Sequence, residues 1–178
     1  MGSLHQGHIS LVRASKKECK KTIVSIFVNP TQFNKKNDYE RYPRNRKRDL
    51  SILKKLKVDF AFLPNRKDIY KSKRKIKIAK KDMVLCAKFR KGHFEGVIDV
   101  MDRLTKMINP KKIFMGEKDF QQLILVKNYL SKRSNSKIVS CKTIRDKHKL
   151  ALSSRNLLLN RKDLNTARSL AQNLINFK

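Results

Sequence analysis

The chain has 178 residues, 39% of them hydrophobic, and its formal net charge at pH 7 is +31. This length suits one domain, or one domain and part of another, with enough apolar residues for a packed core. No apolar run approaches the length of a membrane span, and no basic region with a long apolar stretch follows Met1, so neither a membrane protein nor a secretory signal is expected. The three cysteines are widely spaced and odd in number, which argues against a disulfide framework or a zinc site and fits a reducing cytoplasm.

The positive charge has two interpretations. Clustered Lys and Arg would indicate nucleic-acid binding, because they release counterions from phosphates. In this chain the lysines are spread through every segment, Asn and Ile are plentiful, and no Arg/Gly-rich or aromatic-interleaved tract is visible. That pattern favours a genome rich in A and T, so no specific nucleic-acid partner is expected. Weak, salt-sensitive attraction to nucleic acid would still follow from the charge.

Helical and strand-like segments alternate along the chain. Residues 65–91 are less regular, with short β-like pieces such as residues 75–79, and NPTQF at residues 29–33 is a turn signal. Apolar spacing predicts helices over residues 9–20, 44–57, 92–110 and 118–133, and strands over residues 22–28, 58–63, 112–116 and 137–144.

This alternation predicts an α/β fold, a Rossmann-like and mostly parallel sheet with helices on both faces. In such a sheet, ligands bind beyond the carboxyl ends of the strands. Four polar groups occur where a strand or loop gives way to the next element, and we expect them to share one site: His5 with His8, Asn29 with Gln32, residues 116–119, and residues 153–155.

The motif LHQGH places His5 and His8 on either side of Gly7, at the start of an expected helix. A helix N-terminus attracts anions through its free N–H groups, and glycine lets a phosphate approach the backbone. Two imidazole N–H donors can stabilise the charge that builds up during nucleotidyl transfer. Surface or capping histidines are the alternative, but two of the chain's four histidines lie here, which favours the functional interpretation.

Two further motifs carry groups that suit a nucleotide. In GEKDFQQ, Lys118 can neutralise phosphate charge and Asp119 can accept hydrogen bonds from ribose hydroxyls. An acidic first helical turn is the alternative, most of all for Glu117. ALSSRN, residues 151–156, offers two hydroxyls and a guanidinium to a polyphosphate leaving group. An ordinary serine cap would explain ALSSRN by itself, so its value depends on the other two motifs.

With these motifs in this order, the chain resembles the pantothenate synthetase (pantoate–β-alanine ligase) family of the HxGH nucleotidyltransferase superfamily. Related nucleotidyltransferases share HxGH but not FVNPTQF together with GEKDFQQ, so the combination is specific. The matching stretches cover nearly all of the chain: MGSLHQGH, SIFVNPTQF, YPR at residues 42–44, GHFEGV, GEKDFQQL and ALSSRN.

The resemblance implies a two-step reaction. ATP and pantoate would give pantoyl adenylate and pyrophosphate with the help of Mg²⁺, and the amine of β-alanine would then release pantothenate and AMP. No side chain need become a covalent nucleophile. The family pattern implies catalytic roles for His5, His8, Lys118, Ser153, Ser154 and Arg155, ATP binding by Met1, His8, Gly116, Lys118, Asp119, Ile144, Leu152, Ser153, Ser154 and Arg155, and pantoate binding by Asn29, Gln32, His93 and Gln122, with Arg90 in the site wall.

The resemblance also implies a division into two domains. Residues 1–143 would be a Rossmann-like ATP- and pantoate-binding domain whose first strand is expected to be missing, and residues 144–178 the beginning of a smaller C-terminal lid domain. The resemblance also implies a cytoplasmic enzyme that forms a homodimer in the full-length family, with no membrane partner and no metal-binding residues.

Two alternatives stay open from the sequence. One is a different HxGH nucleotidyltransferase, such as a cytidylyltransferase, against which Gln32 and Gln122 argue. The other is a non-enzymatic, basic nucleic-acid-binding module.

Overall fold

Four short strands organise the computed structural model, which describes residues 1–177. β1 (Ile23–Ser25) pairs in parallel with β2 (Phe60–Phe62), and β3 (Lys112–Gly116) pairs in parallel with β4 (Lys137–Cys141). Within the described residues the strands form two separate two-stranded sheets, so β1 and β3 are not paired with each other. Each parallel pair is connected through helices, because parallel strands cannot be joined by a tight hairpin.

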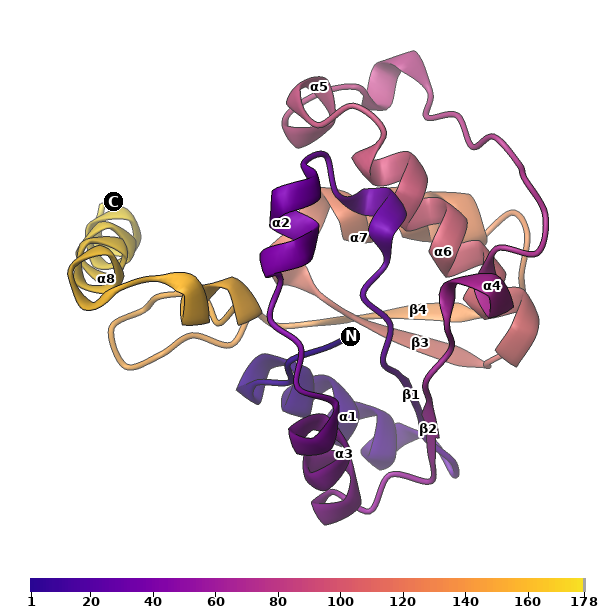
Figure 1. The fold of residues 1–178 in the computed structure, drawn as a ribbon, viewed down its shortest axis with the longest axis horizontal. Helices are drawn as coiled ribbons and strands as arrows, with labels where there is room; N and C mark the ends of the chain where they lie inside the picture. The colour runs from indigo at the N-terminus through magenta and orange to yellow at the C-terminus, as the bar shows by residue number, and fades with distance from the viewer. Residues whose placement is uncertain (178) are drawn as a thin grey trace.

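Helices cover both faces of the β3–β4 pair. Figure 1 shows α1 on one side of these strands and α6 and α7 on the other, which confirms the predicted α/β arrangement. The helices are α1 (Gln6–Glu18), α2 (Lys36–Arg41), α3 (Arg46–Lys55), α4 (Arg66–Ile69), α5 (Cys86–Phe89), α6 (His93–Ile108), α7 (Phe120–Leu130) and α8 (Arg161–Asn176), and the short 3₁₀ turns are η1 (Pro30–Gln32), η2 (Lys80–Asp82), η3 (Glu117–Asp119) and η4 (Ser154–Leu158).

The four predicted helices and four predicted strands are all present, with shorter bounds for most of them. The β-like character of residues 75–79 was misleading, because this segment forms no strand. Its alternation has another cause: Ile76 and Ile78 pack against the core beside α6 and α7, while the intervening lysine is exposed. A half-buried extended segment without a partner strand therefore produces the same period of two.

The core has two parts. One lies between α6, α7 and β3, and Val126 and Leu130 at its centre are each 1% exposed. The other joins the N-terminal segment, α1, β1 and α3 through Leu4, Val12 and Leu53 among others. Contacts of α1 with β3 connect the two parts. α1 therefore packs against both parts of the core.

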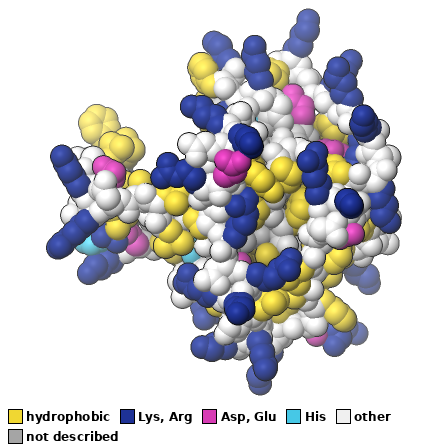
Figure 2. All heavy atoms as spheres, in the orientation of Figure 1, with side chains coloured by type: hydrophobic (Ala, Val, Ile, Leu, Met, Phe, Trp, Pro, Cys, Tyr) yellow, Lys and Arg dark blue, Asp and Glu magenta, His cyan; other side chains and the backbone are white. Residues whose placement is uncertain are grey.

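The C-terminal helix lies apart from this body. Figure 1 shows α8 projecting to one side, and none of its residues is buried. Leu170, Leu174 and Phe177 are exposed there. No helix of the described chain is both long enough and apolar enough to cross a membrane. Figure 2 shows Lys and Arg side chains distributed over the whole visible face, without one dominant patch.

Candidate functional site

The two motif histidines form the first turn of α1. His5 is the N-cap, its Nδ1 accepts a hydrogen bond from the Gly7 amide at 3.1 Å, and Nδ1 of His8 accepts one from the His5 amide at 3.3 Å. The two rings lie 4.1 Å apart between centroids. Because both Nδ1 atoms accept, each neutral ring carries its proton on Nε2. The turn therefore presents two Nε2–H donors.

The electrostatics of this turn keep both histidines neutral. Burial, together with the charges of His5, the N-terminal amino group and Lys118, lowers the pKa of His8 to about 3. Burial also lowers the pKa of His5, with Lys118 as the second cause. Lys118 reaches this position from η3, at the carboxyl end of β3. The charge of an ammonium group thus acts on two neutral N–H donors at this helix N-terminus, a combination that suits an anion.

Gly7 makes the histidine arrangement possible. A Cβ atom at this position would lie 2.8 Å from Cε1 and 3.0 Å from Nδ1 of His5, and 4.0 Å from Cβ of Leu152. A side chain would therefore displace the His5 ring. The same distances place Leu152, from the second half of the chain, next to the HxGH turn.

Ser154 ties the ALSSRN segment to the start of the chain. Its Oγ is buried and donates to the carbonyl oxygens of Ser3 at 3.0 Å and Gly2 at 3.3 Å. The amides of Ser3 and Leu4 in turn donate to the buried carboxylate of Asp49, at 2.8 and 2.7 Å. These bonds bring together segments about 150 residues apart, and they hold the residues just before the HxGH turn.

A second group of polar side chains lies between η1 and α6. Nδ2 of the buried Asn29 donates to Oε1 of Gln32 at 3.2 Å and to the carbonyl of Gly96 at 3.1 Å. His93, at the start of α6, bonds through Nδ1 to the Gln32 carbonyl at 2.6 Å. Burial lowers the pKa of His93, and the Gln32 bond only partly offsets this. The amide group of Gln32 is thus fixed at the end of the β1 segment.

The residues after β3 are more open. A Cβ atom at Gly116 would meet nothing within 4 Å, so this backbone is accessible to a ligand. Lys118 Nζ and Asp119 Oδ2 lie 3.6 Å apart. The charge of Asp119 also acts on Arg155. Burial lowers the pKa of the Arg155 guanidinium, but the bonded Asp38 and, at longer range, Asp119 raise it above its usual value. Arg155 therefore lies within electrostatic reach of the β3 end.

Comparison with known proteins shows to which family this chain belongs. The family model described as pantoate-beta-alanine ligase matches residues 1–178. The chain belongs to the pantoate–β-alanine ligase family. A pantothenate synthetase from Francisella tularensis subsp. novicida (strain U112) is 44% identical over 171 residues, which cover 94% of this chain and 66% of the relative. The chain therefore spans slightly less than two thirds of the length of this relative.

Solved structures of the family show the same fold. A pantoate-beta-alanine ligase from Francisella tularensis, crystallised with beta-gamma ATP and beta-alanine, superposes with a TM-score of 0.95 at 42% identity, covering 98% of this chain and 69% of that one. A pantothenate synthetase from Thermus thermophilus superposes with a TM-score of 0.94 at 35% identity, covering 98% of this chain and 65% of that one.

Several site residues expected for a pantoate–β-alanine ligase lie at the N-terminus of α1. His5 and His8 form this turn, Leu152 and Ser154 contact it or the residues just before it, and the charge of Lys118 acts on both histidines. The remaining expected residues make other contacts. The Leu152 amide donates to the Ile144 carbonyl, the Met1 amino group donates to the Ser25 carbonyl, and the Arg155 amide donates to Ser153 Oγ. The charges of Arg90 and Arg155 act on His93, and Gln122 lies half-buried in the first turn of α7.

Sequence reasoning missed three residues that shape this ligase-family site. Asp49 holds the N-terminal segment, Asp38 pairs with Arg155 at 2.9 Å, and the hydroxyl of Tyr70 donates to Oδ1 of Asn29 at 2.7 Å. Asp49 carried a weak signal, because it is the single acidic residue in the basic stretch RNRKRDLSILKK. The other two carried none, since their partners are distant in sequence.

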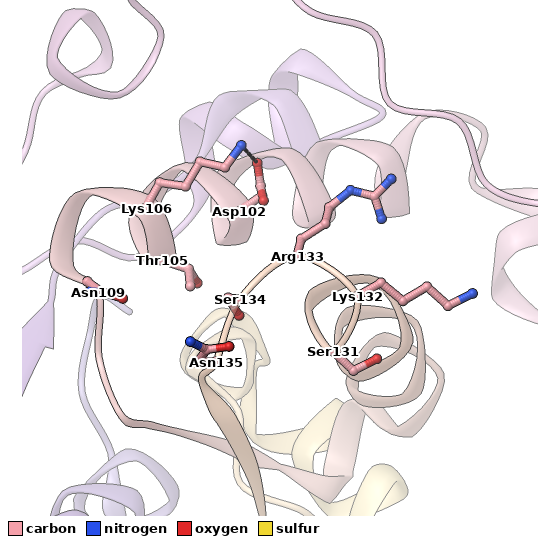
Figure 3. Close-up of a pocket in the computed structure, with 9 residues that line it drawn as sticks. All are labelled: Asp102, Thr105, Lys106, Asn109, Ser131, Lys132, Arg133, Ser134 and Asn135. Carbon is pink, nitrogen blue, oxygen red and sulfur yellow. Dashed lines mark ion pairs between the residues drawn. The ribbon is translucent and has the colours of Figure 1, made fainter.

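A cavity of about 530 Å³ lies elsewhere (Figure 3). It sits between the C-terminal ends of α6 and α7, just before β3 and β4 begin, and so at the opposite edge from the HxGH turn. Its lining is Asp102, Thr105, Lys106, Asn109 and residues 131–135. None of the expected site residues lines this cavity, so the candidate site of the family is at the HxGH turn and not here. Across residues 1–177 no group of three or more His, Cys, Asp or Glu side chains could hold a metal ion.

Proposed function

We propose that this chain catalyses the ATP-dependent ligation of pantoate and β-alanine to pantothenate, through a pantoyl-adenylate intermediate and with release of AMP and pyrophosphate. The observation that carries the proposal is the meeting of two neutral imidazoles, the Lys118 ammonium and the ALSSRN segment at one helix N-terminus. The Francisella tularensis structure, crystallised with an ATP compound and beta-alanine, supports the same chemistry.

In the first step the pantoate carboxylate would attack the α-phosphorus of ATP and expel pyrophosphate. The Nε2–H groups of His5 and His8 would donate to phosphate oxygens, where negative charge increases in the transition state. Lys118 would neutralise part of the same charge, with Ser153 and Arg155 at the leaving phosphates. Fixed donors are effective here because they need no reorganisation during the reaction.

Mg²⁺ would accompany the nucleotide. This ion is usually held by one or two carboxylates together with substrate phosphates and water, not by a cage of protein ligands. That habit fits a site in which Asp119 is the exposed carboxylate beside Lys118. When bound, Mg²⁺ supplies positive charge to the phosphates.

Pantoate would bind beside the HxGH turn. The amide of Gln32, fixed by Asn29 and by its own carbonyl bond to His93, would hold the hydroxyl and carboxylate groups, with Gln122 on the facing helix. The adenylate must then be kept from water until the β-alanine amine attacks its carbonyl. We assign residues 1–143 to the nucleotide- and pantoate-binding domain and residues 144–178, which include ALSSRN, to the lid domain.

Pyrophosphate release tests the proposal. We expect release from ATP only when pantoate is present, pantothenate formation when β-alanine is added, and no release when CTP replaces ATP. His8→Asn should reduce release at least about a hundredfold, as expected for loss of one transition-state donor. The Francisella tularensis relative serves as the positive control. Absence of pantoate-dependent release by this chain, under conditions where the relative turns over, would contradict the proposal.

A further inference from the structure

The guanidinium of Arg155 is held by a carboxylate from the other end of the chain. Its Nε donates to Oδ1 of Asp38 at 3.2 Å and its Nη2 donates to Oδ2 at 2.9 Å. Arg155 belongs to η4 and Asp38 to α2, so 117 residues separate them, and Figure 1 shows the two segments next to each other. Two parallel bonds fix the plane of the guanidinium as well as its position.

Two aromatic rings complete the support. The Arg155 guanidinium carbon lies 4.9 Å from the centroid of the Tyr42 ring and 5.7 Å from that of Phe33. These rings contact each other edge to face, with centroids 5.5 Å apart. Residues 33–42, which include α2, thus supply one carboxylate and two aromatic rings to a single arginine. Each of these contacts favours the planar cation over a flexible ammonium.

The bonds to Asp38 leave part of the guanidinium available. They use the edge formed by Nε and Nη2, so the edge formed by Nη1 and Nη2 faces away from the carboxylate. That second edge has the geometry for another bidentate contact with an oxyanion. We propose that Asp38 is a positioning residue, which together with Tyr42 and Phe33 orients Arg155 so that its second edge binds the β- and γ-phosphates of ATP. The inference rests on the proposed function.

A purely stabilising role is the alternative, and the exposure of the pair argues against it. The side chains of Arg155 and Asp38 are 46% and 35% exposed. Ion pairs this exposed contribute little to folding. A positioning role needs no such gain, because it lowers the conformational cost of phosphate binding instead.

Nucleotide binding measured by calorimetry separates the two roles. In Asp38→Asn we expect ATP to bind about three- to tenfold more weakly, the loss associated with one less well oriented charged contact, with AMP binding unchanged because AMP lacks the outer phosphates. Asp38→Glu should recover part of the ATP affinity. In an Arg155→Ala background, Asp38→Asn should have no further effect on ATP affinity, because the group that it orients is gone. Glu40→Gln is the matched control, since it removes the same charge from an exposed residue of the same helix.

The possible results separate a failure of the positioning role from a failure of the proposed function. An Asp38→Asn variant that binds ATP as tightly as the parent chain, or one that loses ATP and AMP affinity equally, overturns the positioning role and leaves the proposed function intact. An equal effect of Asp38→Asn with and without Arg155 also overturns it. Failure of the parent chain to bind ATP at all would overturn the proposed function, and this inference with it.

Discussion

His5 and His8 use their two ring nitrogens for different purposes. The Nδ1 atoms accept backbone hydrogen bonds that cap α1, so the Nε2–H groups remain for a ligand. A protonated ring would donate from both nitrogens and lose its capping bond. The cap and the burial of His8 therefore act in the same direction, and both favour neutral imidazoles. A capping role and a ligand-binding role do not exclude each other here, because each ring can serve both.

The buried His8 makes stability depend on pH. Its pKa is about 3 in the folded chain and near 6.5 when exposed, so the unfolded chain takes up the proton first as the pH falls. The stabilisation is complete above about pH 6.5 and is lost as the pH falls toward about 3. Between about pH 6.5 and pH 5 this one residue should cost about 2 kcal/mol.

The variant His8→Asn isolates this effect. Its Oδ1 can replace Nδ1 as the acceptor for the His5 amide, and it does not titrate. Urea unfolding at about pH 7.5 and at about pH 5 should therefore show a smaller difference in the free energy of unfolding than the parent chain shows. If the two chains lose stability equally, the titrating group lies elsewhere.

At the scale of elements, the contact between α6 and η1 positions the amides of Asn29 and Gln32. Gly96 allows this contact: a Cβ atom there would lie 2.4 Å from the carbonyl oxygen of Thr31. Gly96→Ala should destabilise the fold by about 1–3 kcal/mol through overpacking, although alanine is the better helix former by about 1 kcal/mol. Because η1 must move away, ATP- and pantoate-dependent pyrophosphate release should also fall.

Gly116→Ala is the matched control for stability. A Cβ atom at this position meets nothing within 4 Å, so the free energy of unfolding should change by less than about 0.5 kcal/mol. Denaturant titration of both variants provides the comparison. Equal stability of the two alanine variants would show that η1 adapts to a side chain at position 96 without cost.

Element order and type could be read from the sequence because they depend on local patterns. The helix at residues 92–110 is an example: it is present as α6, and its buried face includes the expected Val97 together with Phe94, Ile98 and Val100. The failure at residues 75–79 is also physical, because a half-buried extended segment and an edge strand share the same alternation. Asp49 shows what remains out of reach, since its role depends on the amides of Ser3 and Leu4, 46 and 45 residues away.

At the scale of the whole molecule, the described chain is a body with one helix outside it. α8 buries none of its residues, and the ion pair of Arg168 with Asp146, at 2.8 Å, connects it to the loop after β4. Ending the chain after Asn160 should change the free energy of unfolding by less than about 1 kcal/mol, because it removes one ion pair at the surface and no buried side chain.

The same truncation should make the chain less prone to self-association, because it removes the exposed Leu170, Leu174 and Phe177. Sedimentation at several protein concentrations measures this, and denaturant titration measures stability. A loss of several kcal/mol in the truncated chain would mean that α8 packs on the body in solution.

The net charge of +31 is the other property of the whole molecule, and Figure 2 shows its Lys and Arg side chains spread over the visible face. A dispersed charge attracts nucleic acid without reading its sequence, and binding that neutralises about six or more phosphates weakens by about a thousandfold between about 50 and 200 mM salt. We therefore expect two labelled RNAs of equal length and different sequence to bind equally at about 50 mM salt, and both to dissociate at about 200 mM, as followed by fluorescence anisotropy. A sequence preference that survives the higher salt would instead require base contacts, because phosphate contacts are the same in both RNAs.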